Sequence, residues 1–409
     1  MLNIPPADLI SAEAARARLN LLAKPPGSLG RLEDLAVALA ASQGRALPTA
    51  DRPQIIVFAA DHGVARAQAV SPYPPEVTAL MVQTFASGRA AVSALARVAG
   101  AGLEVVELGV VRSLPLTIAP GVRVVRESIA PGTNDLSVQA AMSPGERDAA
   151  MGLGREAVLR AVADTVDVLA LGEMGIGNTT AAAALAARLL GRRGAELAGP
   201  GTGLDAAGVS HKALVIQRGL DRDGPGDPLG ALADLGGLEI AALVGGILEA
   251  AARRVPVVLD GFIVSVAALV AVRLNPNVRG RGGGGGRGGR GRGGGGGAHG
   301  GAGIRDTLLG GPEAGAPRAL GAATCACATC SGPARLWRAG GVGVVFLGTK
   351  PPRGGCPTPP LRLMSRRARL GALRLCGPRA CSGRDLRRAG RRGGVGPRRG
   401  AGRGGLGCR

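Results

Sequence analysis

The chain has 409 residues, of which 71 are glycine and only six are aromatic, and its formal net charge is +21. The charge is unevenly distributed. Residues 279–409 contain 26 of the 50 Lys and Arg residues but only three acidic residues, whereas residues 1–278 carry a net charge of −2. A near-neutral stretch of that length suffices for a globular domain, so the high overall charge does not indicate nucleic-acid or membrane binding by this part of the chain.

The sequence also disfavours a secreted protein and a membrane-spanning protein. The N-terminal residues lack a basic region followed by an apolar core, so we expect no secretory signal and a cytoplasmic setting. The most apolar run, residues 255–272, contains Pro256 and Asp260. It predicts a buried strand, a turn and a helix better than a membrane span.

The first 50 residues are predicted to form a small helical subdomain. Residues 7–23 have helical apolar spacing and end at a Lys-Pro-Pro-Gly sequence. Ser28 is then placed to cap a second helix, whose apolar residues recur at Leu29, Leu32 and Leu35.

Residues 51–277 are predicted to form an α/β core. Fully buried strands are expected at residues 54–60, 103–108, 166–171 and 256–259. Helices are expected at residues 76–98, 144–163, 179–190, 206–220 and 238–253. Short apolar runs that alternate with helices indicate a mostly parallel, Rossmann-like sheet flanked by helices.

Residues 278–409 form a tail of different character. It lacks periodic apolar faces and carries the excess positive charge, so we predict that it is disordered, with at most short helices around residues 361–375. Cys325-x-Cys327-x-x-Cys330 is half of a zinc site without a matching second half. Residues 279–300 contain 15 glycines and resemble an RNA-binding Arg/Gly segment, but no aromatic residue is available for base stacking.

Polar residues follow three of the predicted strands. Asp61 and His62 follow the first, residues 172–180 follow the third, and Asp260 follows the last. In open parallel sheets ligands bind beyond the carboxyl ends of strands, so these strand ends are candidates for one site. A single histidine at such a position is more often structural than catalytic. The core offers no second His or Cys at metal-binding spacing, so we predict no metal.

The strongest candidate is the sequence GEMGIGNTT at residues 172–180. Gly175 and Gly177 allow backbone N–H groups to approach a phosphate, Asn178 or Thr179 is predicted to cap the next helix, and Glu173 is placed to act as a base. A plain glycine-rich turn is the simplest alternative. Dinucleotide binding is another, but the third glycine of the GxGxxG fingerprint is replaced by Thr180.

A second glycine-rich turn lies at residues 199–205 and includes Gly201, Thr202 and Gly203. Lys212 follows on the next predicted helix. A glycine-rich turn with a lysine suits a phosphate, although a surface loop with a solvated lysine fits the pattern equally well.

Several of these stretches also occur, in the same order, in one known family. The stretches are KPPGSLGRLE (24–33), ADHGV (60–64), VSPYP (70–74) with EVT (76–78), GTN (132–134), AM (141–142), GEMGIGNTT (172–180) and PVVLDGF (256–262). They resemble the nicotinate-nucleotide–dimethylbenzimidazole phosphoribosyltransferase family of cobalamin biosynthesis. The resemblance implies a Rossmann-like sheet with a small helical domain, a homodimer and no cofactor.

The resemblance also implies a reaction. A ring nitrogen of 5,6-dimethylbenzimidazole displaces nicotinate from nicotinate mononucleotide, which gives α-ribazole 5′-phosphate. The leaving group is already a pyridinium, whereas the attacking ring becomes cationic and must lose its N–H proton. One positioned carboxylate is therefore the main requirement, and the remaining residues align the two substrates.

The resemblance assigns residues to each substrate. It places the phosphate and ribose at Gly175, Gly177, Asn178 and Thr179, with Gly201, Thr202, Gly203 and Lys212 as further candidates. It places the benzimidazole beside Ser71, Pro72, Tyr73 and Leu80, where Leu80 replaces a glutamine that the family often has.

The C-terminal part departs from the family. There the family has an Arg-Leu-Gly-Glu-Gly-Thr-Gly run whose glutamate is regarded as the principal base, and this chain has no such run. We expect impaired activity, with Glu173 as the remaining candidate. The tail composition is typical of GC-rich codons read out of frame, which suggests a frame change near codon 278. The alternative is a non-catalytic nucleotide-binding core with a genuine RNA-binding tail.

Overall fold

The computed structural model describes residues 2–279, 335–339 and 342–346, all within a compact unit of residues 1–351. The predictions of a disordered tail, of a half zinc site, of an Arg/Gly segment and of helices at residues 361–375 lie outside the described residues. Strands β6 (Arg335–Ala339) and β7 (Val342–Phe346) form an antiparallel pair. The expectation that the tail contains no strand is therefore wrong at these residues.

The first two helices are α1 (Leu9–Leu21) and α2 (Arg31–Gln43), as the apolar spacing predicts. Asp8 caps α1 by accepting hydrogen bonds from the backbone N–H groups of Ile10 and Ser11. The predicted Ser28 cap is wrong, because α2 begins after Gly30 without a side-chain cap. Instead, the Glu33 carboxylate reaches back and accepts a bond of 3.1 Å from the Leu29 N–H.

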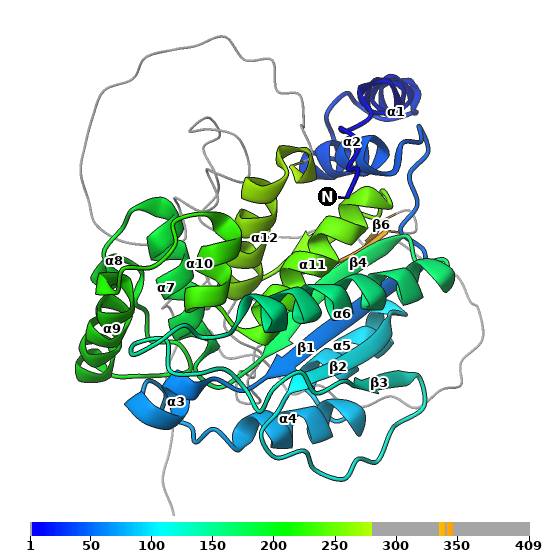
Figure 1. Cartoon of the computed structure of the whole chain (residues 1–409). Helices are drawn as coiled ribbons and strands as arrows, with labels where there is room; N and C mark the ends of the chain where they lie inside the picture. Colours follow the sequence, from blue (N-terminus) through cyan, green and yellow to red (C-terminus); the bar gives the residue numbers. More distant parts are fainter. Residues whose placement is uncertain (1, 280–334, 340–341, 347–409) are drawn as a thin grey trace, which may run out of the picture. The chain divides into compact units, whose positions relative to one another are not determined.

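The core contains one five-stranded sheet in the order β3-β2-β1-β4-β5, and every neighbouring pair is parallel (Figure 1). The strands are β1 (Pro53–Ala60), β2 (Gly102–Gly109), β3 (Val122–Arg126), β4 (Val168–Met174) and β5 (Val257–Leu259). The prediction of a parallel α/β sheet is confirmed. Strand β3 was not among the predicted strands. It lies at the edge of the sheet, where its valines are partly buried and Arg123 and Arg126 are exposed.

The helices around the sheet mostly match the predicted segments. They are α3 (Gly63–Gln68), α4 (Val77–Ala86), α5 (Ala91–Ala99), α6 (Pro144–Ala163), α7 (Asn178–Leu190), α8 (Gly194–Leu197), α9 (Ala206–Asp221), α10 (Pro228–Leu235), α11 (Leu238–Ala252) and α12 (Phe262–Leu274), with a short 3-10 turn at Pro276–Val278. The single helix predicted at residues 76–98 is wrong. It divides into α4 and α5 because Gly88 adopts a φ of +71°.

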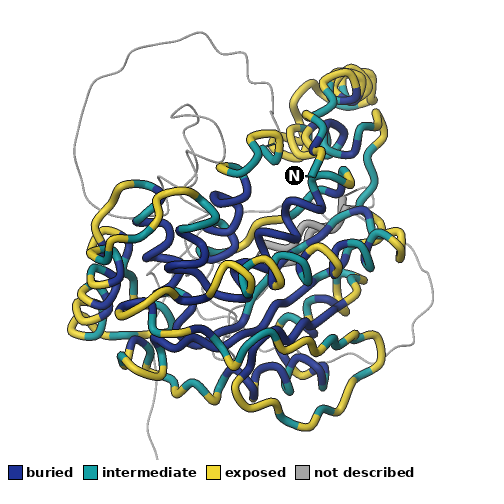
Figure 2. Tube along the Cα trace, viewed as in Figure 1, coloured by how far each residue is buried: buried dark blue, intermediate teal, exposed yellow. Residues whose placement is uncertain are grey.

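Strand β1 is buried on both faces, so its side chains divide between two apolar clusters (Figure 2). Ile56 and Phe58 belong to the cluster that contains residues of α6, α7, α11 and α12. Val57 and Ala59 belong to the cluster formed with α4 and α5. Burial on both faces explains the continuous apolar run in the sequence.

Helices α6 and α11 approach each other closely through glycine. A Cβ atom added to Gly154 would lie 1.9 Å from the Ala242 carbonyl oxygen, and one added to Gly245 would lie 2.0 Å from that of Met151. Only glycine permits this approach, so the two backbones touch directly.

The apolar run at residues 255–272 forms β5, a turn and α12, as predicted. Within the part of the chain that the structure describes, no helix combines the length and the apolar character required to cross a membrane.

Candidate active site

The carboxyl ends of β1, β4 and β5 lie at one edge of the sheet because these strands are adjacent and parallel. The segments that begin at Asp61, Gly175 and Asp260 therefore meet there. Strand β4 extends further than predicted and includes Glu173. Leu169 and Leu171, which share a face of β4 with Glu173, pack in the cluster that contains α11. The Glu173 carboxylate thus belongs to the α11 side of the sheet.

The turn between β4 and α7 packs tightly against its neighbours. A Cβ atom at Gly175 would lie 2.4 Å from the Ala60 carbonyl oxygen, and one at Gly177 would lie 2.8 Å from the Ala65 Cβ. The Ile176 N–H donates to the Oγ1 atom of buried Thr78 over 3.1 Å. These contacts fix the turn, and Thr78 is a supporting residue that sequence reasoning missed.

The predicted helix cap at Asn178 or Thr179 is wrong. The N-cap of α7 is Gly177, with a φ of +95°, and no side chain caps the helix. Both predicted residues already lie inside the first turn, and their side chains have other partners. Asn178 donates from Nδ2 to the Glu173 carboxylate, and Thr179 accepts a bond from Lys212. The positive end of the α7 dipole remains available to an anion.

Lys212, on α9, is buried with 1% of its surface exposed. Its Nζ donates to Thr179 Oγ1 over 2.7 Å and to the Gly199 carbonyl over 3.4 Å. Within the described residues, no carboxylate forms an ion pair with it. Burial lowers the pKa of Lys212 to about 8. An ammonium group held in this way favours a bound anion.

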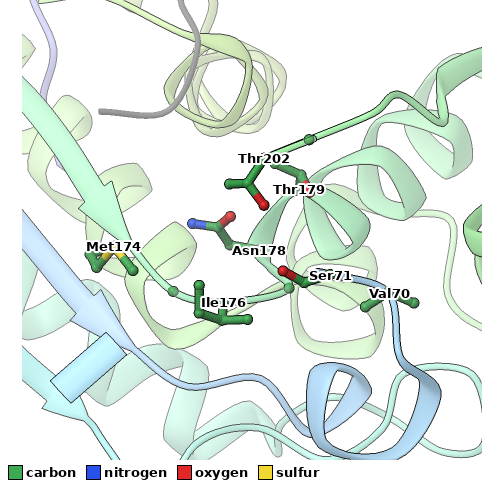
Figure 3. A pocket seen from close by; sticks show the side chains of 10 residues that line it. Val70, Ser71, Met174, Ile176, Asn178, Thr179 and Thr202 are labelled. Atoms are coloured by element: carbon green, nitrogen blue, oxygen red, sulfur yellow. The ribbon is translucent and has the colours of Figure 1, made fainter. Parts of the chain in front are cut away.

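A small pocket joins the two glycine-rich turns (Figure 3). It is lined by Val70, Ser71, Met174, Gly175, Ile176, Gly177, Asn178, Thr179, Gly201 and Thr202. The polar side chains of Ser71, Asn178, Thr179 and Thr202 gather around it (Figure 3). Two turns from distant parts of the sequence thus contribute to one concave site.

The other candidate residues lie outside this lining. Pro72 and Leu80 are exposed, and Tyr73 is partly buried against the cluster of α4 and α5. Gly203 continues the second turn with a φ of +123°. Asp260 is exposed at the end of β5.

A buried ion pair lies behind the glycine turn. His62 Nε2 is 2.7 Å from Glu239 Oε1, and neither side chain is exposed. Glu239 occupies the first turn of α11 and was missed by sequence reasoning. The available signal was a carboxylate at the start of an otherwise apolar helix. Asp61 accepts a backbone N–H bond from Val111, which fits a structural role.

The charges in this region affect one another. Burial, followed by the negative charge of Glu239, raises the pKa of Glu173 to about 7, although the Asn178 hydrogen bond and His62 act in the opposite direction. Burial alone would lower the pKa of His62. The charges of Glu239, Asp61 and Glu173 and the Glu239 hydrogen bond outweigh burial, so this pKa is raised. A carboxylate with a pKa of about 7 is suited to accept a proton near neutral pH.

Among the described residues, no group of three or more His, Cys, Asp or Glu side chains is arranged to hold a metal ion. The site combines a glycine-rich turn at a helix N-terminus, a buried lysine and one carboxylate with an elevated pKa. This combination suits transfer of a phosphorylated group with removal of one proton.

Comparisons with known proteins agree on one family. A family model described as "Phosphoribosyltransferase" matches residues 4–281. The nicotinate-nucleotide–dimethylbenzimidazole phosphoribosyltransferase of Ectopseudomonas mendocina (strain ymp) is 52% identical over 279 residues, which cover 67% of this chain and 77% of the relative. The enzyme of that name from Bradyrhizobium diazoefficiens is 50% identical over 275 residues, with the same coverage of both chains.

Solved structures give the same result. The crystal structure of the Thermus thermophilus phosphoribosyltransferase of this name matches with a TM-score of 0.61 and 43% identity, over 66% of this chain and 80% of that chain. The crystal structure of CobT from Thermus thermophilus matches with a TM-score of 0.62 and 44% identity, over the same shares of the two chains. The chain therefore belongs to the nicotinate-nucleotide–dimethylbenzimidazole phosphoribosyltransferase family.

Proposed function

We propose that this chain transfers the phosphoribosyl group of nicotinate mononucleotide to 5,6-dimethylbenzimidazole, which yields α-ribazole 5′-phosphate and nicotinate for the lower ligand of cobalamin. Membership of the family supports the reaction. The observation that carries the proposal is the pairing of Lys212 with Thr179 beside the glycine turn. This arrangement places an uncompensated positive charge next to the uncapped N-terminus of α7.

In the proposed mechanism, the phosphate binds at Gly175, Gly177 and Thr179, with Lys212 supplying the counter-charge. The nicotinate ring nitrogen that is bonded to C1′ is already a pyridinium, so nicotinate leaves without protonation. The benzimidazole ring, which we place beside Ser71, becomes cationic on attack. Glu173 accepts its N–H proton, because this carboxylate has a pKa of about 7.

The family's C-terminal glutamate has no counterpart in this sequence, and the family match ends at residue 281, close to the change in composition. We therefore propose that the chain as written has impaired activity, with Glu173 as the remaining base. A change of reading frame near codon 278 accounts for both features.

The test compares α-ribazole phosphate formation by the chain as written and by a gene whose frame is restored near codon 278. We expect turnover from the restored gene and a rate about 10²- to 10⁴-fold lower from the chain as written, which is the contribution of one positioned base. Comparable turnover would contradict impairment and leave Glu173 as the sole base. Inactivity of both would contradict the proposed function and favour a binding core without catalysis.

We also propose the homodimer that the resemblance implies, and a cytoplasmic setting. Light scattering of the purified chain tests the first, and fractionation of the producing cells tests the second. A monomer at micromolar concentration would contradict the proposed assembly.

A further inference from the structure

The buried pair of His62 and Glu239 is not explained by the binding of either substrate. It joins two distant parts of the chain: His62 follows β1, and Glu239 begins α11, 177 residues later. Neither side chain is exposed, so neither lines the pocket. An ion pair buried to this extent is weak evidence for a role in stability, because apolar residues of similar volume often stabilise a core at least as well.

The His62 side chain packs against three glycines, of which Gly175 and Gly177 belong to the site and Gly237 precedes α11. A Cβ atom at Gly175 would lie 3.2 Å from its Cδ2 and Nε2 atoms, and one at Gly177 would lie 3.4 Å from the His62 Cβ. A Cβ atom at Gly237 would lie 2.4 Å from its Cε1 atom. The ring therefore lies directly behind the turn that follows Glu173, and larger residues at Gly175 or Gly237 would displace it.

The pair is also incompletely satisfied. The His62 Nδ1 atom and the Glu239 Oε2 atom are buried without a hydrogen-bond partner among the described residues. Leaving buried polar atoms unpaired costs free energy, so a purely structural contact would be expected to satisfy them. The unpaired atoms therefore favour an electrostatic role for the pair over a purely structural one.

The charged and polar groups around Glu173 come from three elements. Glu239 lies on α11, His62 follows β1, and Asn178 opens α7. Asp61 and Glu173 add negative charge near His62. When His62 is an imidazolium, it compensates the charge of Glu239. When His62 is neutral or absent, Glu173 faces a bare carboxylate in a poorly solvated environment.

We propose that His62 and Glu239 form a positioning pair for the reaction, in which His62 supports the glycine turn and compensates Glu239 so that Glu173 can ionise. The proposal rests on the proposed function in one respect, namely that Glu173 is the base. His62 and Glu239 touch neither substrate and act only through Glu173 and the turn.

The proposal predicts opposite effects for two substitutions. His62→Gln removes the compensating cation, so the acid limb of the kcat/KM profile should move to higher pH. Glu239→Gln removes the opposing carboxylate, so this limb should move to lower pH. For each pH unit by which the acid limb moves upward, kcat/KM should fall about tenfold at any pH below that limb. A purely structural pair would lower activity in both variants at every pH.

A spectroscopic test does not depend on activity. The chain has only three histidines, so the His62 imidazole can be followed by ¹⁵N NMR of the full chain and identified by its loss in His62→Gln. We expect its pKa to lie above the ordinary value of 6.5. Both Glu239→Gln and Glu173→Gln should lower it, and Glu239→Gln should have the larger effect. His211→Gln, which replaces an exposed histidine, is the matched control.

The two experiments separate failure of this inference from failure of the proposed function. An inactive chain in which His62 still responds to Glu173→Gln retains the coupling and contradicts only the proposed function. A His62 pKa that is unaffected by Glu173→Gln overturns the inference, even if the chain is fully active. Glu173→Gln leaves the pair itself intact, and if His62→Gln does not fold, the His62 signal can be identified by eliminating the signals of the other two histidines.

Discussion

The substitution Glu173→Gln should stabilise the protein at alkaline pH. The pKa of Glu173 is raised from 4.5 to about 7 in the folded state, mainly by burial. At a pH well above 7 the folded protein contains a charge that its surroundings disfavour. The difference between the two pKa values corresponds to about 3 kcal/mol of unfolding free energy.

The direction in which the unfolding free energy changes with pH follows from proton binding. Between pH 4.5 and 7 the folded state binds more of this proton than the unfolded state, so the unfolding free energy falls as the pH rises through this window. Glutamine does not ionise, and its amide oxygen still accepts the Asn178 Nδ2–H bond. We therefore expect Glu173→Gln to match the parent below pH 4.5 and to exceed its stability by about 3 kcal/mol at pH 8.

Urea unfolding at pH 5 and at pH 8 measures this difference. Glu196→Gln is the matched control, because Glu196 is exposed and a backbone hydrogen bond from Arg193 lowers its pKa. The control should show no gain at pH 8. A stability change in Glu173→Gln that is equal at the two pH values would refute the reasoning. The same variant should lose turnover, since it removes the proposed base.

Three further predictions concern the glycine turn and Lys212. Lys212→Met should raise the unfolding free energy by about 2 kcal/mol at pH 7, which is the gain from removing a buried charge minus the loss of one hydrogen bond. Because the folded-state pKa of Lys212 is about 8, the charge contribution fades as the pH rises towards 10.5, where only the hydrogen-bond loss of about 1 kcal/mol should remain. Gly175→Ala should lower the unfolding free energy, measured by chemical denaturation, by about 2 kcal/mol or more, because the added Cβ would lie 2.4 Å from the Ala60 carbonyl oxygen. Gly152→Ala in α6 is the control, since its Cβ would meet no atom within 4 Å and should not destabilise the protein. Thr179→Asp should weaken nicotinate mononucleotide binding about tenfold in calorimetry, equivalent to about 1.4 kcal/mol, with Thr179→Ser as the control that keeps the hydroxyl; an unchanged affinity would place the phosphate elsewhere.

The central part of the fold was predictable from sequence because its strands are buried on both faces. Strand β1 appears as an uninterrupted apolar run, and its length, its polar end and its place before a helix all indicate a parallel sheet. Strand β3 was missed because it is short and because Arg123 and Arg126, both exposed at the sheet edge, interrupt its apolar residues. The break between α4 and α5 was missed because one glycine, Gly88, interrupts an otherwise helical pattern.

The candidate site was predictable only where a local motif carries it. Glycines 175 and 177 and Lys212 stand out in the sequence, and the structure brings the two segments together. Thr78 lies in the shared EVT stretch and Glu239 lies in no such stretch, but neither role could be inferred locally, since both depend on contacts with residues about 100 or more positions away. Asn178 was assigned to capping because its residue type favours caps, but its partner is the neighbouring Glu173 side chain.

The glycine contact between α6 and α11 has a consequence for the acidity of the site. Because the backbones touch at Gly154 and Gly245, no side chain can change rotamer to absorb a small displacement of one helix against the other. Helix α11 begins at Leu238, so Glu239 is its second residue and moves together with the helix. The position of this carboxylate relative to α6 is consequently fixed by contact between two peptide backbones, within about two helical turns of Glu239.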